Sequence, residues 1–330
     1  MAPPIAVIGA GAWGTALAIA ARRAGAPVLL WARRPVRPAA LAATRTNAAY
    51  LPEVPLDPAI AVAADPAALA DAGILLLAVP AQHLRATLLV LAPALPPAAP
   101  LVLCAKGIER GTLLLPGEVV DAVLPGRRWA VLSGPTFAAE VARGLPTAIT
   151  LAAADPDLAA GLAAAIGSAT FRPYAAADPT GAMLGGALKN VLAIACGIVM
   201  GRRLGDNARA ALTARGLAEL MRLGRAKGAD PATLMGLAGL GDLVLTCTSR
   251  QSRNLSLGIA LGEGAGLAQA LAGARGVVEG AATAGAAVAL AARLGVELPI
   301  ARAVDAVLNA GAEIDATVAA LLARPFKAET

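Results

Sequence analysis

The first half of the chain alternates short apolar runs with segments of helical period. Such runs are typical of buried strands in a parallel sheet, and the helical segments between them fit strand–helix–strand units. We therefore predict a Rossmann-type α/β domain over residues 1–178, with residues 35–65 as an irregular excursion. The predicted strands are Ile5–Ile8, Val28–Trp31, Ile74–Val79, Leu101–Cys104, Trp129–Leu132, Ala148–Leu151 and Thr170–Arg172, and predicted helices include Thr15–Arg23 and Asp155–Gly167.

The second half shows helical period without a clear strand. Asp178-Pro179 is a helix start, since Asp is a good N-cap and Pro suits the first turn. Helical period continues over 207–228 and 267–295, so we predict an all-α domain over residues 179–330. Three polar or glycine-rich segments interrupt it: Arg203–Asn207 as a turn, Gly236–Leu243 as a loop, and the cluster Ser249–Asn254.

A glycine-rich loop follows the first strand. Gly9, Gly11 and Gly14 form G-x-G-x-x-G between that strand and the next helix. The first glycine permits a tight turn, the second lets a pyrophosphate approach the backbone, and the third allows close helix–strand packing. The helix N-terminus favours the phosphate charge, so the loop predicts a dinucleotide cofactor.

The end of the second strand suggests which dinucleotide is bound. An NAD-preferring site usually has Asp or Glu there, whereas this chain has Arg33 and Arg34 after Ala32. Guanidinium groups bind a 2′-phosphate by paired hydrogen bonds, so we predict preference for NADPH/NADP, with NADH/NAD possible. The alternative is a pair of solvated surface arginines.

Further polar residues follow other predicted strands. In open α/β sheets, ligands lie beyond the carboxyl ends of the strands. That rule places Lys106 and the turn Ser133–Phe137, with Gly134 and Thr136, around one crevice with the glycine loop. The single histidine, His83, fits a packing role better than a catalytic one, so a histidine-based catalytic triad is not expected.

Lys189 stands in a long apolar segment, Gly185–Gly201. On a helix, the positions sharing its face are all uncharged: Leu192, Ala193, Cys196 and Met200. Burial disfavours the charged form of lysine and lowers its pKa, which makes Lys189 a candidate proton carrier. The alternative is a lysine that reaches the surface from an ordinary core helix. Only four of the 28 basic residues are lysines, which favours the catalytic hypothesis.

The cluster Ser252-Arg253-Asn254 suits a phosphate ester, because a guanidinium fork and two uncharged hydrogen-bonding groups lie together. A surface loop is the alternative. Glu279 adds a carboxylate at an apolar break further on.

Composition narrows the classes of function. The chain is 58% apolar and 15% charged, which indicates a globular protein. Its net charge of +6 is dispersed and aromatic residues are 2%, so a small anionic ligand fits better than nucleic acid. Three scattered cysteines show no metal-ligand spacing and suit the reducing cytoplasm. We read no signal peptide, and prolines break the uncharged run 86–105, so stable membrane insertion is not expected.

Taken together, these motifs resemble the prokaryotic-type NAD(P)-dependent glycerol-3-phosphate dehydrogenases over nearly the whole chain. The resemblance rests on the glycine loop with Trp13, Ala105-Lys106-Gly107, Ser133–Ala138, Gly185–Asn190, Gly239–Asp242, Ser252–Asn254 and Val277–Gly280, which occur in family order.

The resemblance implies interconversion of dihydroxyacetone phosphate and sn-glycerol 3-phosphate by a cytoplasmic homodimer that supplies glycerol phosphate for phospholipids. It implies that Lys189 is the proton acceptor. The implied substrate contacts are Lys106, Gly134, Thr136, Lys189, Asp242, Ser252, Arg253 and Asn254. The implied cofactor contacts are Gly9, Gly11, Ala12, Trp13, Gly14, Arg33, Arg34, Lys106, Ala138, Arg253, Val277 and Glu279. Gly185 and Gly186 are expected to let cofactor or substrate approach the helix backbone.

Some positions depart from the family pattern. Ala12 and Thr136 stand where serine is frequent, and Met183 and Met200 replace acidic residues. Two rival functions stay open: a dehydrogenase of the β-hydroxyacid type, which shares the domain plan and the helix lysine, and a non-catalytic module that senses NADP.

Overall fold

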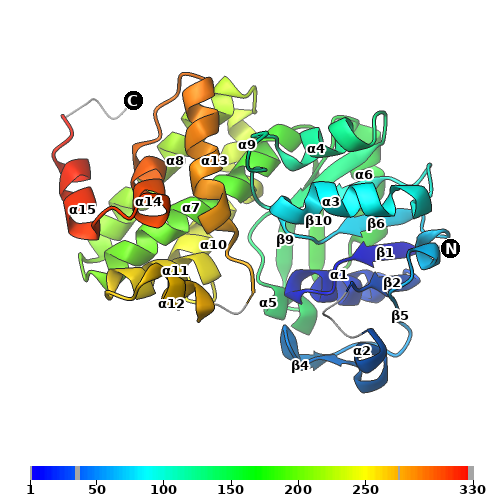
Figure 1. Cartoon of the computed structure of the whole chain (residues 1–330). Helices are drawn as coiled ribbons and strands as arrows, with labels where there is room; N and C mark the ends of the chain where they lie inside the picture. The colour runs from blue at the N-terminus through cyan, green and yellow to red at the C-terminus, as the bar shows by residue number, and fades with distance from the viewer. Residues whose placement is uncertain (1, 34–37, 274–275, 326–330) are drawn as a thin grey trace.

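The computed structural model describes residues 2–33, 38–273 and 276–325 of the 330-residue chain. One half is a β-sheet flanked by helices, and the other half is built of helices (Figure 1). From Pro179 onward the described part of the chain contains no strand. The predicted fold class, a Rossmann-type α/β domain followed by an all-α domain, is confirmed.

Eight strands form the main sheet in the order β10-β9-β8-β7-β6-β1-β2-β5. Strand β1 lies between β2 and β6, so the strand order reverses at β1. Ligands of such sheets bind at the carboxyl ends of the strands beside this reversal. The strands are β1 (Ile5–Ile8), β2 (Val28–Trp31), β5 (Ala61–Ala63), β6 (Ile74–Leu77), β7 (Leu101–Leu103), β8 (Trp129–Ser133), β9 (Thr147–Ala152) and β10 (Phe171–Ala176).

The prediction of a parallel sheet holds for the first six of these strands but not for the last two. Strand β9 pairs antiparallel with β8, and β10 is parallel to β9. The connection from β8 to β9 contains only the six-residue helix α5 (Ala138–Arg143), about 9 Å long. A helix of that length does not carry the chain back across the sheet, so β9 returns in the opposite direction.

The excursion predicted to be irregular contains regular elements. These are α2 (Pro38–Thr44), the paired strands β3 (Thr46–Asn47) and β4 (Leu51–Pro55), and β5, which extends the main sheet beside β2. Leu51, Val54 and Ile60 are buried there. The elements are short and proline-rich, so their periodicity was too weak to identify them from the sequence.

Helices cover both faces of the sheet, and each face has its own core. On one face Leu17 and Leu162 pack with the alternate strand residues Val7 and Leu30. The core on the other face continues into the helical half. The helices are α1 (Ala12–Arg23), α3 (Ala81–Leu91), α4 (Pro116–Val123), α5 and α6 (Pro156–Ile166), with 3₁₀ turns at Pro66–Leu69 and Ala92–Ala94.

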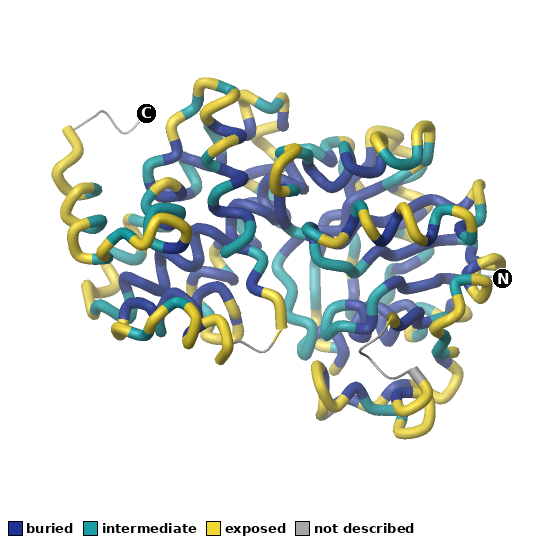
Figure 2. The backbone as a smooth tube through the Cα atoms, in the orientation of Figure 1, coloured by how far each residue is buried: buried dark blue, intermediate teal, exposed yellow. Residues whose placement is uncertain are grey.

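Helix α7 (Pro179–Gly201) is the centre of the helical half. Asp178 caps it as predicted, because its Oδ1 accepts from the backbone N–H of Gly181 at 2.8 Å. The helix is long and apolar enough to span a membrane, but it is buried inside the protein over nearly its whole length (Figure 2). Packed around it are α8 (Asp206–Ala226), α9 (Pro231–Met235), α10 (Asp242–Thr248), α11 (Arg253–Gly262), α13 (Glu279–Arg293) and α14 (Pro299–Asn309).

Helices α7 and α11 cross backbone to backbone. A Cβ atom added at Gly197 would lie 2.2 Å from the carbonyl oxygen of Leu255, and one added at Gly258 would lie 2.1 Å from that of Ile194. Gly201 and Gly262 make the same kind of contact one turn later. Glycine at these positions therefore lets α11 pack directly on α7.

Two predictions in the helical half need correction. The segment Gly236–Leu243 is helical and not a loop, since a π-helical turn at Leu237–Gly241 runs directly into α10. The periodic segment 267–295 is two helices, α12 (Leu267–Ala272) and α13. The last helix of the described residues is α15 (Ile314–Leu322), which packs on α14.

We predict that Gly197→Ala lowers the free energy of unfolding by about 1–3 kcal/mol, because the added methyl group overlaps the α11 backbone. Chemical unfolding measures the change. Gly161→Ala in α6 is the control, since a Cβ there meets no atom within 4 Å. That variant should be neutral or gain about 0.5–1 kcal/mol. Equal stability of Gly197→Ala and the unmodified protein would contradict the close crossing.

Candidate active site

Lys106, Lys189 and Asp242 form one charged cluster where the two halves meet. Asp242 Oδ1 accepts from Lys189 Nζ at 2.5 Å, and Oδ2 accepts from Lys106 Nζ at 2.7 Å. Lys106 follows β7, whereas Lys189 lies in the middle of α7 and Asp242 begins α10. Asp242 is fully buried and Lys189 is 6% exposed. Lys106 and Asp242 are 136 positions apart in the sequence, and the fold brings their charges into contact.

Burial sets the acidity of Lys189. Loss of hydration disfavours the ammonium form and lowers the pKa of Lys189 to about 8, Asp242 opposes this change, and the charge of Lys106 adds to it. The amine therefore gains and loses a proton near neutral pH, as a general acid and base must. This supports the prediction made from the apolar surroundings of Lys189 in the sequence.

Thr246 is part of the same cluster and was missed from the sequence. Its Oγ1 accepts from Lys189 Nζ at 2.9 Å and donates to the backbone carbonyl of Asp242 at 2.6 Å. Thr246 lies one helical turn after Asp242 on α10, so both reach Lys189 from one face. Because the sequence predicted a loop at Gly236–Leu243, Asp242 and Thr246 were not expected to share one face of a helix.

The turn after β8 supplies a carbonyl oxygen to the site. The carbonyl of Gly134 accepts from Lys106 Nζ at 3.0 Å and from Thr136 Oγ1 at 3.2 Å. Lys106 is thereby held between the Gly134 carbonyl and Asp242. The predicted grouping of Lys106, Gly134 and Thr136 at the strand ends agrees with this geometry.

The expectation for Gly185 and Gly186 needs correction. A Cβ at Gly185 would lie 2.2 Å from the carbonyl oxygen of Ala238, and one at Gly186 would lie 2.8 Å from Ser133 Oγ and 3.2 Å from Lys106 Cγ. Protein atoms, not a ligand, fill the space that these glycines leave. Their smallness brings Lys106 close to α7, the helix that carries Lys189.

Two of the three residues in the predicted phosphate cluster have partners within the protein. Ser252 caps α11, because its Oγ accepts from the N–H of Leu255 at 3.2 Å. Asn254 donates to Asn190 Oδ1 at 2.9 Å and accepts from the N–H of Gly280 at 3.0 Å. Asn190 also donates to the carbonyl oxygen of Lys106 at 3.2 Å. This chain of amides joins α7, α11 and α13 beside the lysines.

Arg253 differs from its neighbours. Its guanidinium makes no hydrogen bond or ion pair with the residues that the structure describes, and burial lowers its pKa. Its Nη1 lies 2.6 Å from the position of a Cβ at Gly276, whose φ of +94° favours glycine. An unpaired, partly desolvated arginine is well suited to bind a phosphate.

Glu279 reaches from the helical half to the α/β half. Its Oε1 accepts from the N–H of Ala81 at the start of α3 at 3.2 Å. Burial raises its pKa to about 7, while that N–H and Arg253 oppose the change. Glu279 Oε2 and Thr283 Oγ1 are buried without a hydrogen-bond partner among the described residues, and both face Gly107. A ligand with hydrogen-bond donors would supply partners for these two oxygen atoms.

The glycine loop fits a bound pyrophosphate. A Cβ at Gly9 would lie 2.6 Å from the carbonyl oxygen of Ala78, and one at Gly14 would lie 1.7 Å from that of Gly9. A Cβ at Gly11 meets no atom within 4 Å, so the middle glycine borders open space. Two glycines thus close the turn and the third leaves its backbone accessible, as dinucleotide binding requires.

The remaining predicted cofactor residues lie on several elements of both halves. Ala12 and Trp13 begin α1, and the indole Nε1 of Trp13 is buried without a partner among the described residues. Arg33 is exposed just after β2, and Arg34 lies outside the described residues. Ala138 begins α5, and Val277 is exposed before α13.

The two methionines that depart from the family pattern have local packing roles. Met183 Sδ accepts from the N–H of Gly117 at 3.2 Å, and Met200 Sδ accepts from Arg209 Nη1 at 3.6 Å. Neither methionine contacts the charged cluster through a hydrogen bond.

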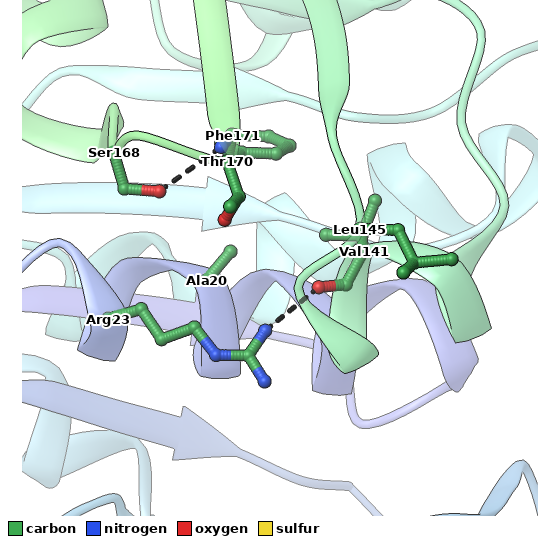
Figure 3. A pocket seen from close by; sticks show the side chains of 7 residues that line it. All are labelled: Ala20, Arg23, Val141, Leu145, Ser168, Thr170 and Phe171. Atoms are coloured by element: carbon green, nitrogen blue, oxygen red, sulfur yellow. Dashed lines mark hydrogen bonds between the residues drawn. The ribbon is translucent and has the colours of Figure 1, made fainter.

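A small pocket beside α1 contains none of the predicted site residues (Figure 3). There Arg23 donates to the carbonyl oxygens of Val141 at 3.0 Å and Ala142 at 2.5 Å, near the C-terminal end of α5. A cation at that end satisfies otherwise unpaired carbonyl groups. The pocket therefore lies where Arg23 of α1 holds the end of α5 through these two hydrogen bonds.

Comparisons with known proteins give a consistent family. Residues 4–159 match the family model "NAD-dependent glycerol-3-phosphate dehydrogenase N-terminus", and residues 178–319 match the corresponding C-terminus. The chain is 55% identical over 326 residues to a glycerol-3-phosphate dehydrogenase [NAD(P)+] from Parvibaculum lavamentivorans, covering 99% of this chain and 98% of the relative.

Solved structures agree with these matches. The crystal structure of glycerol-3-phosphate dehydrogenase from Coxiella burnetii is 38% identical with a TM-score of 0.94, and the match covers 98% of this chain and 99% of that one. A ketopantoate reductase from Ralstonia eutropha JMP134 has a TM-score of 0.59 at 20% identity, covering 96% of this chain and 99% of that one. That likeness shows the shared fold alone.

We predict that Asp242→Asn lowers the pKa of Lys189 from about 8 to roughly 5–7, because removing a nearby anion disfavours the ammonium form. NMR titration of side-chain-labelled lysines measures it, and the chain has only four lysines. Lys227→Gln, which removes an amine that pairs with Glu118, is the control and should leave the pKa of Lys189 unchanged. A Lys189 pKa that stays the same or rises in Asp242→Asn would contradict the ion pair.

Proposed function

The chain belongs to the NAD-dependent glycerol-3-phosphate dehydrogenase family, and we propose that it interconverts dihydroxyacetone phosphate and sn-glycerol 3-phosphate with NAD(P) as cofactor. The observation that carries this proposal is the cluster of Lys106, Lys189 and Asp242 at the carboxyl ends of the sheet strands, on the side of the glycine loop. Its product would supply glycerol phosphate for phospholipid synthesis.

Lys189 is the proton carrier in this proposal. Reduction of the ketone requires a proton on the carbonyl oxygen, and oxidation of the alcohol requires its removal. The bound nicotinamide supplies or accepts the hydride. A pKa of about 8 lets Lys189 give the proton as an ammonium and take it back as an amine.

Lys106 and Asp242 position the proton carrier. Asp242 holds both amines through separate oxygens, and Thr246 accepts from Lys189 on its other side. The positive charge of Lys106 favours the neutral form of Lys189 and stabilises negative charge on the substrate oxygen. With Gly134 and Thr136 nearby, these residues form the substrate side of the site.

Arg253 is the principal phosphate ligand in this proposal. Its guanidinium has no partner among the described residues, and it stands at the first turn of α11, where the helix dipole favours an anion. Ser252 retains a hydroxyl hydrogen to donate, since its oxygen only accepts in the cap. Asn254 has two internal partners, so it contributes to the phosphate site mainly by holding α11 in place.

The cofactor lies along the glycine loop in this proposal. Gly11 gives access to the pyrophosphate, and Glu279 provides a carboxylate oxygen that has no partner among the described residues. Arg33, with Arg34, would bind a 2′-phosphate and make NADPH the preferred cofactor. Further contacts are assigned to Gly9, Ala12, Trp13, Gly14, Lys106, Ala138, Arg253 and Val277.

The domain limits follow from the elements of the fold, whereas the oligomer and the location follow from the family resemblance. We place the dinucleotide domain at residues 1–178 and the helical domain at 179–330, because the last strand ends at Ala176 and Asp178 caps α7. A cytoplasmic homodimer is expected from the family resemblance. The three cysteines are free and buried, which suits a reducing compartment.

The proposal is tested by oxidation of NADPH with dihydroxyacetone phosphate, compared with a panel of small 2-keto and 3-keto acids. Turnover of the ketone phosphate supports the proposal. Turnover of a keto acid alone would favour a β-hydroxyacid-type enzyme, and binding of NADPH without turnover of any substrate would favour a sensor.

We predict that Lys189→Ala lowers kcat by about 10²–10⁴-fold, as the loss of a general acid and base does. Titration should show that NADPH still binds within a few fold of the unmodified protein, because Lys189 contacts Asp242 and Thr246 and not the glycine loop. Near-normal turnover in this variant would exclude Lys189 as the proton carrier.

We predict that Arg33→Ala combined with Arg34→Ala raises KM for NADPH by about 10–100-fold, the cost of one or two charge-assisted hydrogen bonds. KM for NADH should change little, because NADH has no 2′-phosphate. Steady-state kinetics with both cofactors measure the ratio, and an unchanged NADPH to NADH preference would show that the arginines are only surface charges.

A further inference from the structure

Asn47 belongs to none of the motifs identified above, yet its side chain is bonded to the glycine loop. It lies on β3 and is 4% exposed. Its amide nitrogen donates to the carbonyl oxygen of Ala10 at 2.9 Å and to Thr15 Oγ1 at 2.7 Å. Both hydrogens of the amide group are used in these two bonds.

One acceptor lies near the start of the glycine loop and the other directly after its end. Ala10 stands between the first two glycines, and Thr15 directly follows Gly14 in the first turn of α1. Both are buried, Thr15 completely. A single side chain therefore bridges the entrance of the loop and the start of the helix, and holds the Ala10 carbonyl inside the protein.

The excursion between β2 and β6 holds Asn47 in place. Asn47 pairs with Leu51 across the β3–β4 ladder, and its carbonyl accepts from the N–H of Tyr50 at 3.1 Å. The same excursion ends in β5, which is bonded to β2 at the edge of the main sheet. Asn47 is thus held by the β3–β4 ladder, in a segment that rejoins the main sheet at β5.

We propose that Asn47 is a positioning residue that holds Gly9–Gly14 in its phosphate-binding conformation before the cofactor arrives. The proposal rests on the proposed function in one respect, namely that this loop binds the pyrophosphate of NADP(H). Asparagine suits the role because it offers two donors without charge. An aspartate of the same shape has no donor when ionised and would repel both the Ala10 carbonyl and a pyrophosphate.

The test compares Asn47→Asp and Asn47→Ala with the unmodified protein. We expect the Kd for NADPH, measured by fluorescence titration, to rise about tenfold in Asn47→Ala and further in Asn47→Asp. Amide hydrogen exchange in residues 8–17 of the cofactor-free protein should become faster in both.

The kcat at saturating NADPH and the KM for dihydroxyacetone phosphate should change less than about threefold, because Asn47 has no contact with the lysine cluster. The matched control is Asn207→Asp, at an exposed position in α8.

An Asn47→Asp variant with unchanged NADPH affinity and unchanged loop exchange would overturn the proposal. If both Asn47 variants fail to fold, Thr15→Val tests the proposal instead. It removes the hydroxyl that accepts from Asn47 and keeps the bond from Asn47 to the Ala10 carbonyl. That variant should weaken NADPH binding about threefold, and unchanged affinity and exchange would overturn the proposal. Failure of the unmodified protein to bind NADPH would instead overturn the proposed function, and loop exchange in the cofactor-free protein would still decide the role of Asn47.

Discussion

A buried carboxylate shared by two amines is the interaction on which the rest of this site depends. Asp242 has no exposure to solvent and bonds to Lys106 and Lys189 through different oxygens. Burying an ion is costly unless its partners are well placed, and removing one partner from a buried pair typically costs about 3–5 kcal/mol. The fold must therefore bring β7, α7 and α10 together accurately. The close glycine contacts at Gly185 and Gly186 are part of the way it does so.

This constraint links stability to chemistry. Two protonated amines with one carboxylate leave an excess positive charge in a buried place. Burial lowers the pKa of Lys189, the charge of Lys106 adds to this effect, and Asp242 opposes it. A phosphate-bearing substrate would offset the excess, and so would negative charge that develops on a carbonyl oxygen. Arg253 adds a further cation without a partner among the described residues. The site is thus electrostatically prepared for an anionic substrate, which agrees with the family to which the chain belongs.

The sequence predicted those features of the fold and the site that depend on a local pattern of residues or on a rare residue type. The strands around the glycine loop, the cap at Asp178 and the catalytic candidate Lys189 could all be identified, because a run of apolar residues or a rare lysine carries its own signal. The reversed direction of β9, the pairing of α7 with α11 through Gly197 and Gly258, and the bond from Asn47 to Ala10 could not. The last two are contacts between distant segments, of which one sequence alone gives no measure. The direction of β9 depends on the connection through α5, whose six residues are too few to show a helical period. Thr246 is an intermediate case. Its i,i+4 spacing from Asp242 is visible in the sequence, but the spacing has meaning only on a helix, and the glycines of Gly236–Leu243 favoured a loop instead.

The central claim is that one amine, Lys189, carries the proton in both directions with a pKa of about 8. The most direct test is the pH dependence of kcat/KM measured between about pH 7 and 9.5 for ketone reduction and for alcohol oxidation. Because reduction needs the ammonium form and oxidation needs the amine, kcat/KM should fall with pH in the first direction and rise in the second, through the same pKa near 8. Profiles that are flat, or that change in the same sense in both directions, would contradict the account.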